Sequence, residues 1–91
     1  MKWQLVAAHA VKLRAWDDEL IVFNYLSGDT HLLGDAAAHI VATLQHSPAD
    51  DRTIAAELCR RMQFDRTDEV IPEVGHILAE LKALNLVEEV A

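Results

Sequence analysis

The sequence predicts a small α+β domain in which a three-stranded antiparallel sheet precedes three helices. Residues 11–16 alternate apolar and long polar side chains, which is typical of a half-buried strand. An apolar, β-branched and aromatic run at residues 20–25 is followed by Ser-Gly-Asp and a second short apolar run, which is typical of a β-hairpin. From residue 36 onward, apolar residues recur at helical spacing in three segments.

The three strands are predicted as an antiparallel meander at Val11–Trp16, Glu19–Asn24 and residues 30–33, with a first turn at residues 17–18. The first strand is expected to expose Lys12 and Arg14 and to bury Val11, Leu13 and Ala15. Gly28 can adopt the positive φ that a tight reversal needs, and Ser27 and Asp29 can hydrogen-bond to their own backbone there. Residues 1–10 show no clear period and are expected to be a lead-in whose Trp3 packs on the domain.

The three helices are predicted at residues 36–45, 52–62 and 68–84. Their expected N-caps are Asp35, the pair Asp50-Asp51, and Asp68. Pro72 would then lie in the first turn of the third helix, where no intrahelical hydrogen bond is lost. Asn85 is expected to be a left-handed cap, followed by a short extended tail at residues 86–90. The side chains expected to face inward are Ala37, Ile40, Val41 and Leu44, then Ile54, Ala55, Leu58, Cys59 and Met62, then Val70, Ile71, Val74, Ile77, Leu78, Leu81 and Leu84. Strands followed by helices in this order give a winged-helix-like architecture.

Length and composition set limits on the function. The 91 residues make one domain, spanning residues 1–91, and the net charge of -7 disfavours a nucleic-acid binder, which needs a basic surface. Cys59 is the single cysteine, so neither an intramolecular disulfide nor a cysteine-based zinc site is expected. The first ten residues fit neither a signal peptide nor a membrane span, so no membrane association and a cytoplasmic location are expected.

The hairpin region resembles a known family. WDDEL at residues 16–20, followed by SGDTHLL at residues 27–33, is similar to the PqqD-type peptide chaperones, and within them to the branch associated with HPr-kinase-related gene systems. These modules are also called recognition elements for ribosomally made, post-translationally modified peptides (RiPPs). The resemblance covers nearly the whole chain and extends to LNLV at residues 84–87, where the family often has glycine in place of Asn85.

The resemblance implies a non-enzymatic adaptor without a cofactor. Such a protein holds the leader region of a precursor peptide as an extra strand on its third strand, with side chains entering a groove against the third helix, and delivers it to a modifying enzyme. Strand addition gives affinity through backbone hydrogen bonds and specificity through alternate side-chain pockets. The strand residues that match are Asp29, Thr30, His31, Leu32 and Leu33.

Which side of the third helix lines the groove is not determined by the helical wheel. Val74 and Leu81 lie at the centre of the apolar stripe, with Ile71, Gly75, Leu78 and Lys82 along one border and Glu73, Ile77, Glu80 and Leu84 along the other. We favour the first border as the peptide-binding side. Gly75 would let a backbone approach closely, and Lys82 could meet an acidic client.

Other functions are weaker interpretations of the same residues. Ser27, Asp29 and His31 are the residue types of a hydrolase triad, but their spacing on a hairpin provides no oxyanion donors, so no catalytic residue is predicted. The five histidines show no metal-ligand spacing, so no metal site is predicted. The arginines around the second helix form either a solvated face or a docking patch for a partner protein: Arg52, Arg60, Arg61 and Arg66.

Two alternatives to peptide capture stay open. A winged-helix nucleic-acid binder would use the third helix for recognition, but that helix carries acidic side chains against Lys82 alone and would repel phosphates. A structural module could instead pair its exposed strand edge with a second copy and form a homodimer.

Overall fold

The computed structural model describes residues 2–6, 11–16, 19–24 and 28–90. The predicted turn at residues 17–18 and the turn role of Ser27 lie outside this part of the chain. The same holds for the predicted inward side chains of Val11 and Ala15. Within the described residues the protein is an α+β fold in which a strand meander precedes three helices, so the predicted fold class is confirmed.

Three strands form the predicted meander and pair antiparallel in sequence order: β2 (Val11–Trp16), β3 (Glu19–Asn24) and β4 (Asp29–Leu33). The register places Leu13 opposite Val22, and Val22 is fully buried while Leu13 packs against the core. Lys12 and Arg14, at the alternate positions, are exposed as predicted. Gly28 has φ +78, which confirms the reversal expected before β4.

A second sheet of three short strands corrects the expectation that residues 1–10 are only a lead-in. Its members are β1 (Lys2–Leu5), β5 (Ala49–Asp50) and β6 (Val87–Val90), in the order β5-β1-β6. Trp3 pairs with Ala49 on one side and Glu89 on the other, and its side chain packs against the core as predicted. The extended tail expected near the end of the chain is therefore a sheet strand.

The first two helices differ in how they begin. α1 (Asp35–His46) starts one residue earlier than predicted, with Gly34 as its N-cap, so the prediction that Asp35 caps this helix is wrong. Asp35 lies in the first turn, where its Oδ1 is 3.3 Å from His39 Nε2. α2 (Asp51–Met62) is capped by Asp50, whose Oδ1 accepts a 2.7 Å hydrogen bond from the backbone N–H of Thr53. Hydrogen bonding by the Thr53 side chain, and then by its backbone N–H, lowers the pKa of Asp50.

The third helix, α3 (Thr67–Ala83), begins before the predicted cap. Arg66 occupies the N-cap position, so the assignment of Asp68 as the cap is wrong. Pro72 consequently lies inside the helix, in its second turn, and cannot donate the hydrogen bond that the carbonyl of Asp68 would accept there. The helix ends as expected, because Asn85 has φ +60.

Both α2 and α3 end in a Schellman motif. After α3, the backbone N–H of Leu86 donates to the Leu81 carbonyl at 3.0 Å. After α2, Gln63 takes the left-handed conformation with φ 59, and the N–H of Phe64 donates to the Cys59 carbonyl at 3.0 Å. This arrangement satisfies carbonyls that the helix leaves unpaired and fixes the direction in which the chain leaves each helix.

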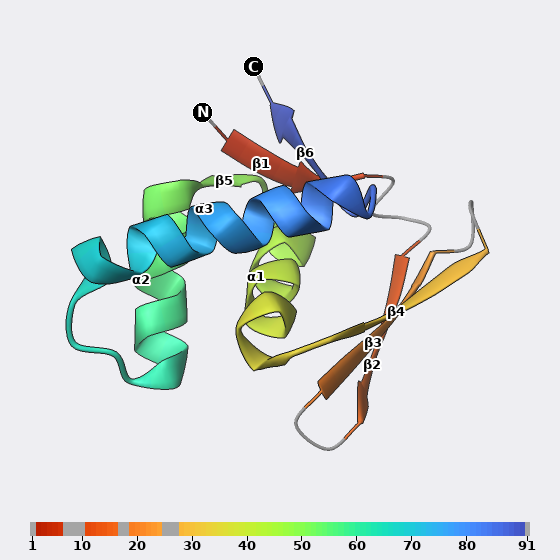
Figure 1. Cartoon of the computed structure of the whole chain (residues 1–91), viewed down its shortest axis with the longest axis horizontal. Helices are drawn as coiled ribbons and strands as arrows, with labels where there is room; N and C mark the ends of the chain where they lie inside the picture. Colours follow the sequence, from red (N-terminus) through yellow and green to blue (C-terminus); the bar gives the residue numbers. More distant parts are fainter. Residues whose placement is uncertain (1, 7–10, 17–18, 25–27, 91) are drawn as a thin grey trace.

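The core lies among the three helices and the two sheets. In Figure 1, α3 lies across α1 and α2, β1 and β6 lie beside the C-terminal part of α3, and the β2-β3-β4 sheet extends away from the helices. Cys59 is buried and Met62 packs against the core, as predicted. Leu84 is 41% exposed, which corrects its predicted inward position. The buried side chains include Leu5, Val22, Leu33, Ile40, Val41, Leu44, Ile54, Ala55, Leu58, Val74, Leu78, Leu81, Leu86 and Val87.

Candidate functional site

The strand β4 is an edge of its sheet. Among the described strands it pairs with β3 on one side only, so the backbone groups on its other side have no strand partner in that part of the chain. Its side chains alternate as the pleat requires: Leu33 is buried and His31 half-buried, whereas Thr30 and Leu32 are exposed. An edge of this kind can accept a further strand.

Leu32 is the most exposed large apolar side chain of the described residues, at 62%. It lies opposite Ile21 in the sheet register, and Thr30 lies opposite Phe23. Because side chains on paired positions share one face of a sheet, the outward face of the meander carries apolar side chains close to the free edge. A strand added to β4 would therefore find both backbone partners and apolar neighbours.

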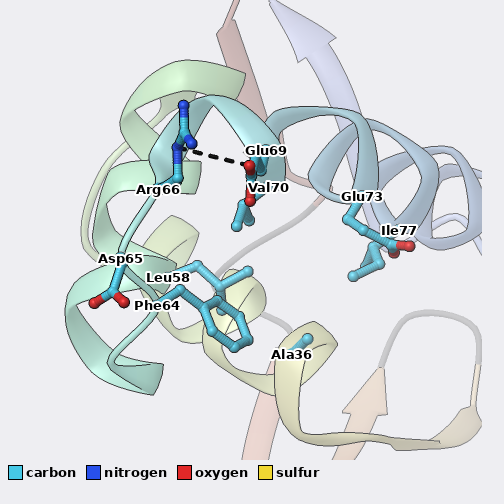
Figure 2. A pocket seen from close by; sticks show the side chains of 9 residues that line it. All are labelled: Ala36, Leu58, Phe64, Asp65, Arg66, Glu69, Val70, Glu73 and Ile77. Carbon is cyan, nitrogen blue, oxygen red and sulfur yellow. Dashed lines mark ion pairs between the residues drawn. The ribbon is translucent and has the colours of Figure 1, made fainter.

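An apolar cavity of about 550 Å³ lies among the helices next to the end of β4 (Figure 2). The strand ends at Leu33, and Ala36, in the first turn of α1, is already part of the cavity wall. The remaining walls come from α2, the loop that follows it, and α3. The lining residues are Ala36, Leu58, Phe64, Asp65, Arg66, Glu69, Val70, Glu73 and Ile77.

The floor and the opening of this cavity differ in chemistry. Leu58, Phe64 and Val70 supply apolar surface, and Phe64 is 47% exposed although it is a large aromatic side chain. The Schellman motif after α2 explains its position, because the left-handed Gln63 reverses the chain just before Phe64. A concave apolar site with a few polar groups is the usual form of a ligand pocket.

Charged groups surround the opening of the cavity. Figure 2 shows the carboxylates of Asp65, Glu69 and Glu73 spaced around the apolar side chains. Arg66 is the one cation among the lining residues, and its Nε lies 3.6 Å from Glu69 Oε1. The rim is therefore acidic, with its cation already paired.

The α3 residues predicted to bind the peptide do not line this cavity. Lys82 turns toward the other side of the helix, where its Nζ lies 3.6 Å from Glu89 Oε1 on β6. Leu78 is fully buried, and Ile71 packs against the core. Gly75 is exposed, with open space where a Cβ would be.

The opposite border of α3 contributes the cavity lining. Glu73 and Ile77, which the helical wheel places on that border, lie in the wall together with Val70. Periodicity identifies both borders but does not orient the helix in the fold. The signal that sequence reasoning missed is Phe64, an apolar residue placed between two helices among polar neighbours.

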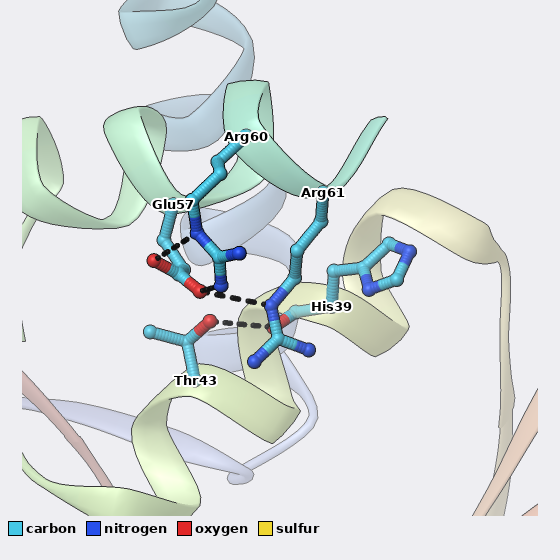
Figure 3. Close-up of polar contacts among 5 residues, drawn as sticks. All are labelled: His39, Thr43, Glu57, Arg60 and Arg61. Atoms are coloured by element: carbon cyan, nitrogen blue, oxygen red, sulfur yellow. Dashed lines mark hydrogen bonds and ion pairs between the residues drawn. The ribbon is translucent and has the colours of Figure 1, made fainter. Parts of the chain in front are cut away.

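Two arginines of α2, Arg60 and Arg61, form a local network rather than a cluster with Arg66. Arg60 contacts both oxygens of Glu57, with its Nε 3.3 Å from Oε2, and Arg61 Nε donates to Glu57 Oε1 at 3.1 Å (Figure 3). Hydrogen bonds from Arg60 and then Arg61 lower the pKa of Glu57 to about 2, and Glu57 raises the pKa of Arg60. The carboxylate of Glu57 thus offsets part of the charge of these two arginines, while Arg66 belongs to the cavity rim.

Other kinds of site find no support in the part of the chain that the structure describes. That part holds no group of three or more side chains suited to a metal ion, and Ser27 of the considered triad lies outside it. His31 is a half-buried strand residue. None of the described helices is long and apolar enough to cross a membrane.

Comparison with known proteins gives one strong structural likeness. No protein-family model matches the chain, and the search of curated proteins found no significant match. Among solved structures the chain is similar to TbiB1, in a structure of TbiB1 in complex with the TbiA(beta) leader peptide. The two share 19% sequence identity and a TM-score of 0.75, over 97% of this chain and 98% of that chain. At this identity the likeness shows a shared fold along the whole chain.

Proposed function

We propose that this protein is a non-enzymatic adaptor of the PqqD or RiPP-recognition-element type. It binds the leader region of a ribosomally made precursor peptide as an added strand on β4 and presents that peptide to a modifying enzyme. The observation that carries the proposal is the outer edge of β4, which has no strand partner on one side among the described residues and has an apolar cavity beside its end.

The two outer strands of the meander differ in a way that favours β4 as the binding edge. β2 carries Lys12 and Arg14, both exposed, and charged side chains are a common means of protecting a strand edge from pairing. β4 has neither lysine nor proline between Asp29 and Leu33, and it exposes Leu32 instead. An incoming peptide therefore meets less electrostatic and steric opposition at β4.

The likeness to TbiB1 supports this proposal. That protein has the same fold over its whole length and was solved with a leader peptide bound. The hairpin string SGDTHLL, from which the family resemblance comes, ends in β4 itself. The sequence resemblance thus favours β4 as the binding strand, and the shared fold independently supports a leader-peptide adaptor.

The proposed peptide contacts combine strand and helix residues. The backbone of Asp29–Leu33 pairs with the peptide, while Thr30 and Leu32 flank it on the outward face. On α3 the proposal uses Glu73 and Ile77 in the cavity wall. Lys82 is not included, because it is paired with Glu89 on β6.

The alternatives are less well supported by the same surfaces. A nucleic-acid binder needs cations on its recognition helix, whereas the exposed side chains of α3 include Asp68, Glu69, Glu73 and Glu80. Self-association through β4 uses the same free edge as peptide binding, so it is an outcome of the test below.

The test is a titration of isotope-labelled protein with peptides from short reading frames beside the gene, followed through backbone amide shifts. We expect the largest shifts at residues 29–33 and along the cavity wall. Peptides methylated at one backbone nitrogen at a time should lose affinity at alternate positions, because an added antiparallel strand pairs alternate residues with β4. Binding that leaves residues 29–33 unshifted would contradict the proposal. If the protein forms a dimer through β4 and no peptide dissociates it, the result would favour the structural homodimer over the peptide adaptor.

A further inference from the structure

The acidic cavity beside β4 is not needed for strand pairing itself, because backbone hydrogen bonds form between strands whatever the charge of their side chains. Its rim holds the carboxylates of Asp65, Glu69 and Glu73 over an apolar floor. We propose that this cavity selects clients that carry a lysine or arginine next to an apolar side chain. The inference rests on the proposed function and names the chemistry of the peptide that β4 binds.

The position of the cavity makes it reachable from the strand. β4 ends at Leu33, and the first turn of α1 brings Ala36 into the cavity wall only three positions later. A peptide paired with β4 that continues past Leu33 therefore comes to the cavity within a few residues. The same segment can pair its backbone with β4 and place side chains among α1, α2 and α3.

The apolar floor accounts for the apolar part of the client. Leu58, Val70 and Ile77 come from two helices, and Phe64 adds an aromatic ring that is about half exposed. The volume of about 550 Å³ exceeds the size of one side chain and lies in the usual range for a ligand pocket. An apolar side chain and the methylene stem of a neighbouring lysine or arginine can both lie on this surface.

The rim accounts for the charge of the client. Three acidic residues and one arginine line the cavity, and that arginine is held by Glu69 with 3.6 Å between Nε and Oε1. Asp65 and Glu73 have no ion-pair partner among the described residues. A cationic head group entering the rim can pair with Asp65 or with Glu73, and it can also lie against the face of Phe64. An acidic segment would be repelled by the same groups.

This inference reverses the charge that the sequence alone predicts for the client. That expectation depended on Lys82, whose ammonium group turns away from the cavity and pairs with Glu89. The net charge of -7 for the whole chain acts in the same direction as the rim, because it attracts cationic peptides at long range.

The experiment selects client peptides from random sequences, so it requires no known client. A phage-displayed library of random dodecapeptides is selected against three forms of the full chain. These are the wild type, a cavity variant with D65N, E69Q and E73Q, and a control variant with D51N, D68N and E88Q. Both variants lose three exposed carboxylates, but the control residues do not line the cavity. Circular dichroism checks that each form is folded.

We expect the wild type and the control variant to enrich lysine or arginine beside an apolar residue, and the cavity variant to lose this enrichment. A synthetic peptide from the wild-type pool should bind the cavity variant roughly tenfold more weakly, which is the combined effect of a few partly exposed ion pairs. The control variant should bind it within about threefold of the wild type. Pools without cationic enrichment, or enrichment that survives in the cavity variant, would overturn the inference.

The selected peptide also separates this inference from the proposed function. When it is titrated into isotope-labelled protein, shifts at residues 29–33 support strand addition whatever its charge. If the selected peptides are uncharged or acidic and still shift residues 29–33, the inferred preference for cationic clients is wrong while strand addition stands. A cationic pool that binds without shifts at residues 29–33 overturns strand addition, and a selection that yields no binder counts against both.

Discussion

Leu78 in α3 and Leu84 at its C-cap together test how this helix is oriented in the fold. The helical wheel puts Leu78 on the border predicted to face the peptide, but its side chain is 0% exposed, whereas Leu84 is 41% exposed. The same substitution, leucine to alanine, should therefore have very different effects at the two positions. L78A leaves a cavity in the core, and L84A mainly trims surface.

The expected magnitudes follow from burial. Replacing a fully buried leucine by alanine costs about 2–5 kcal/mol in the free energy of unfolding. A domain of this size has a total stability of about 5–14 kcal/mol, so L78A removes a large share of it. The loss corresponds to a decrease in Tm of at least about 8 °C. L84A should cost no more than about 1 kcal/mol, because much of that side chain is already in water.

The assay is urea unfolding of both variants and the wild type, followed by circular dichroism, together with the affinity for one selected peptide. We expect L78A to retain affinity within about threefold under conditions where it stays folded, because the side chain presents no surface to a ligand. If L78A lost less than about 1 kcal/mol of stability while its affinity fell tenfold or more, Leu78 would be a contact residue. The placement of α3 with Leu78 in the core would then be wrong.

Three further predictions concern backbone and charge. G28A should lower stability by about 1–2 kcal/mol, because the φ of +78 at this turn is unfavourable for a residue with a Cβ, and urea unfolding measures the loss. Q63G should raise stability by about 0.5–1 kcal/mol in the same assay, since glycine adopts the left-handed conformation at the end of α2 without strain; a lower unfolding midpoint would contradict this. The pKa of Glu57, lowered to about 2 from the ordinary 4.5, means that its ionised form stabilises the fold above pH 4.5 and that this contribution is lost as the pH falls toward 2. The difference in unfolding free energy between wild type and E57Q should accordingly shrink over that pH range. The Glu57 carboxyl carbon, followed by carbon-detected NMR, should show a titration midpoint near pH 2. A midpoint near 4.5 would show that Arg60 and Arg61 do not hydrogen-bond to this carboxylate in solution.

Local patterns in the sequence were sufficient for the meander and the helices. The alternation in residues 11–16 predicts a strand that is present, and Asp50 caps α2 through Thr53 as expected. The second sheet could not be predicted, because β1, β5 and β6 have only four, two and four residues and are separated by most of the chain. Such strands depend on their partners rather than on their own sequence.

The candidate site likewise combines residues that local sequence patterns predict with residues that only the tertiary fold brings together. The strand residues Asp29–Leu33 follow from turn chemistry and from the family resemblance, and they form an outer strand of the sheet in the part of the chain that the structure describes. The side of α3 that meets the cavity depends on how the helix rotates when its central stripe is buried. That rotation is set by Val74 and Leu81 against the other elements, and it brings Ile77 to the cavity and Lys82 to β6. The arrangement of side chains around a groove is thus a tertiary property.

The pairing of β1 with β6 has a practical consequence for engineering. Lys2 lies opposite Val90, so the chain enters and leaves the domain through neighbouring antiparallel strands. Figure 1 shows the start of β1 and the end of β6 on one side of the molecule, away from the β2-β3-β4 sheet. A tag, a surface linkage or a fluorescent partner attached at either end would therefore leave β4 accessible. The domain could also be inserted into a loop of a host protein, because its two ends span little more than the distance between adjacent strands.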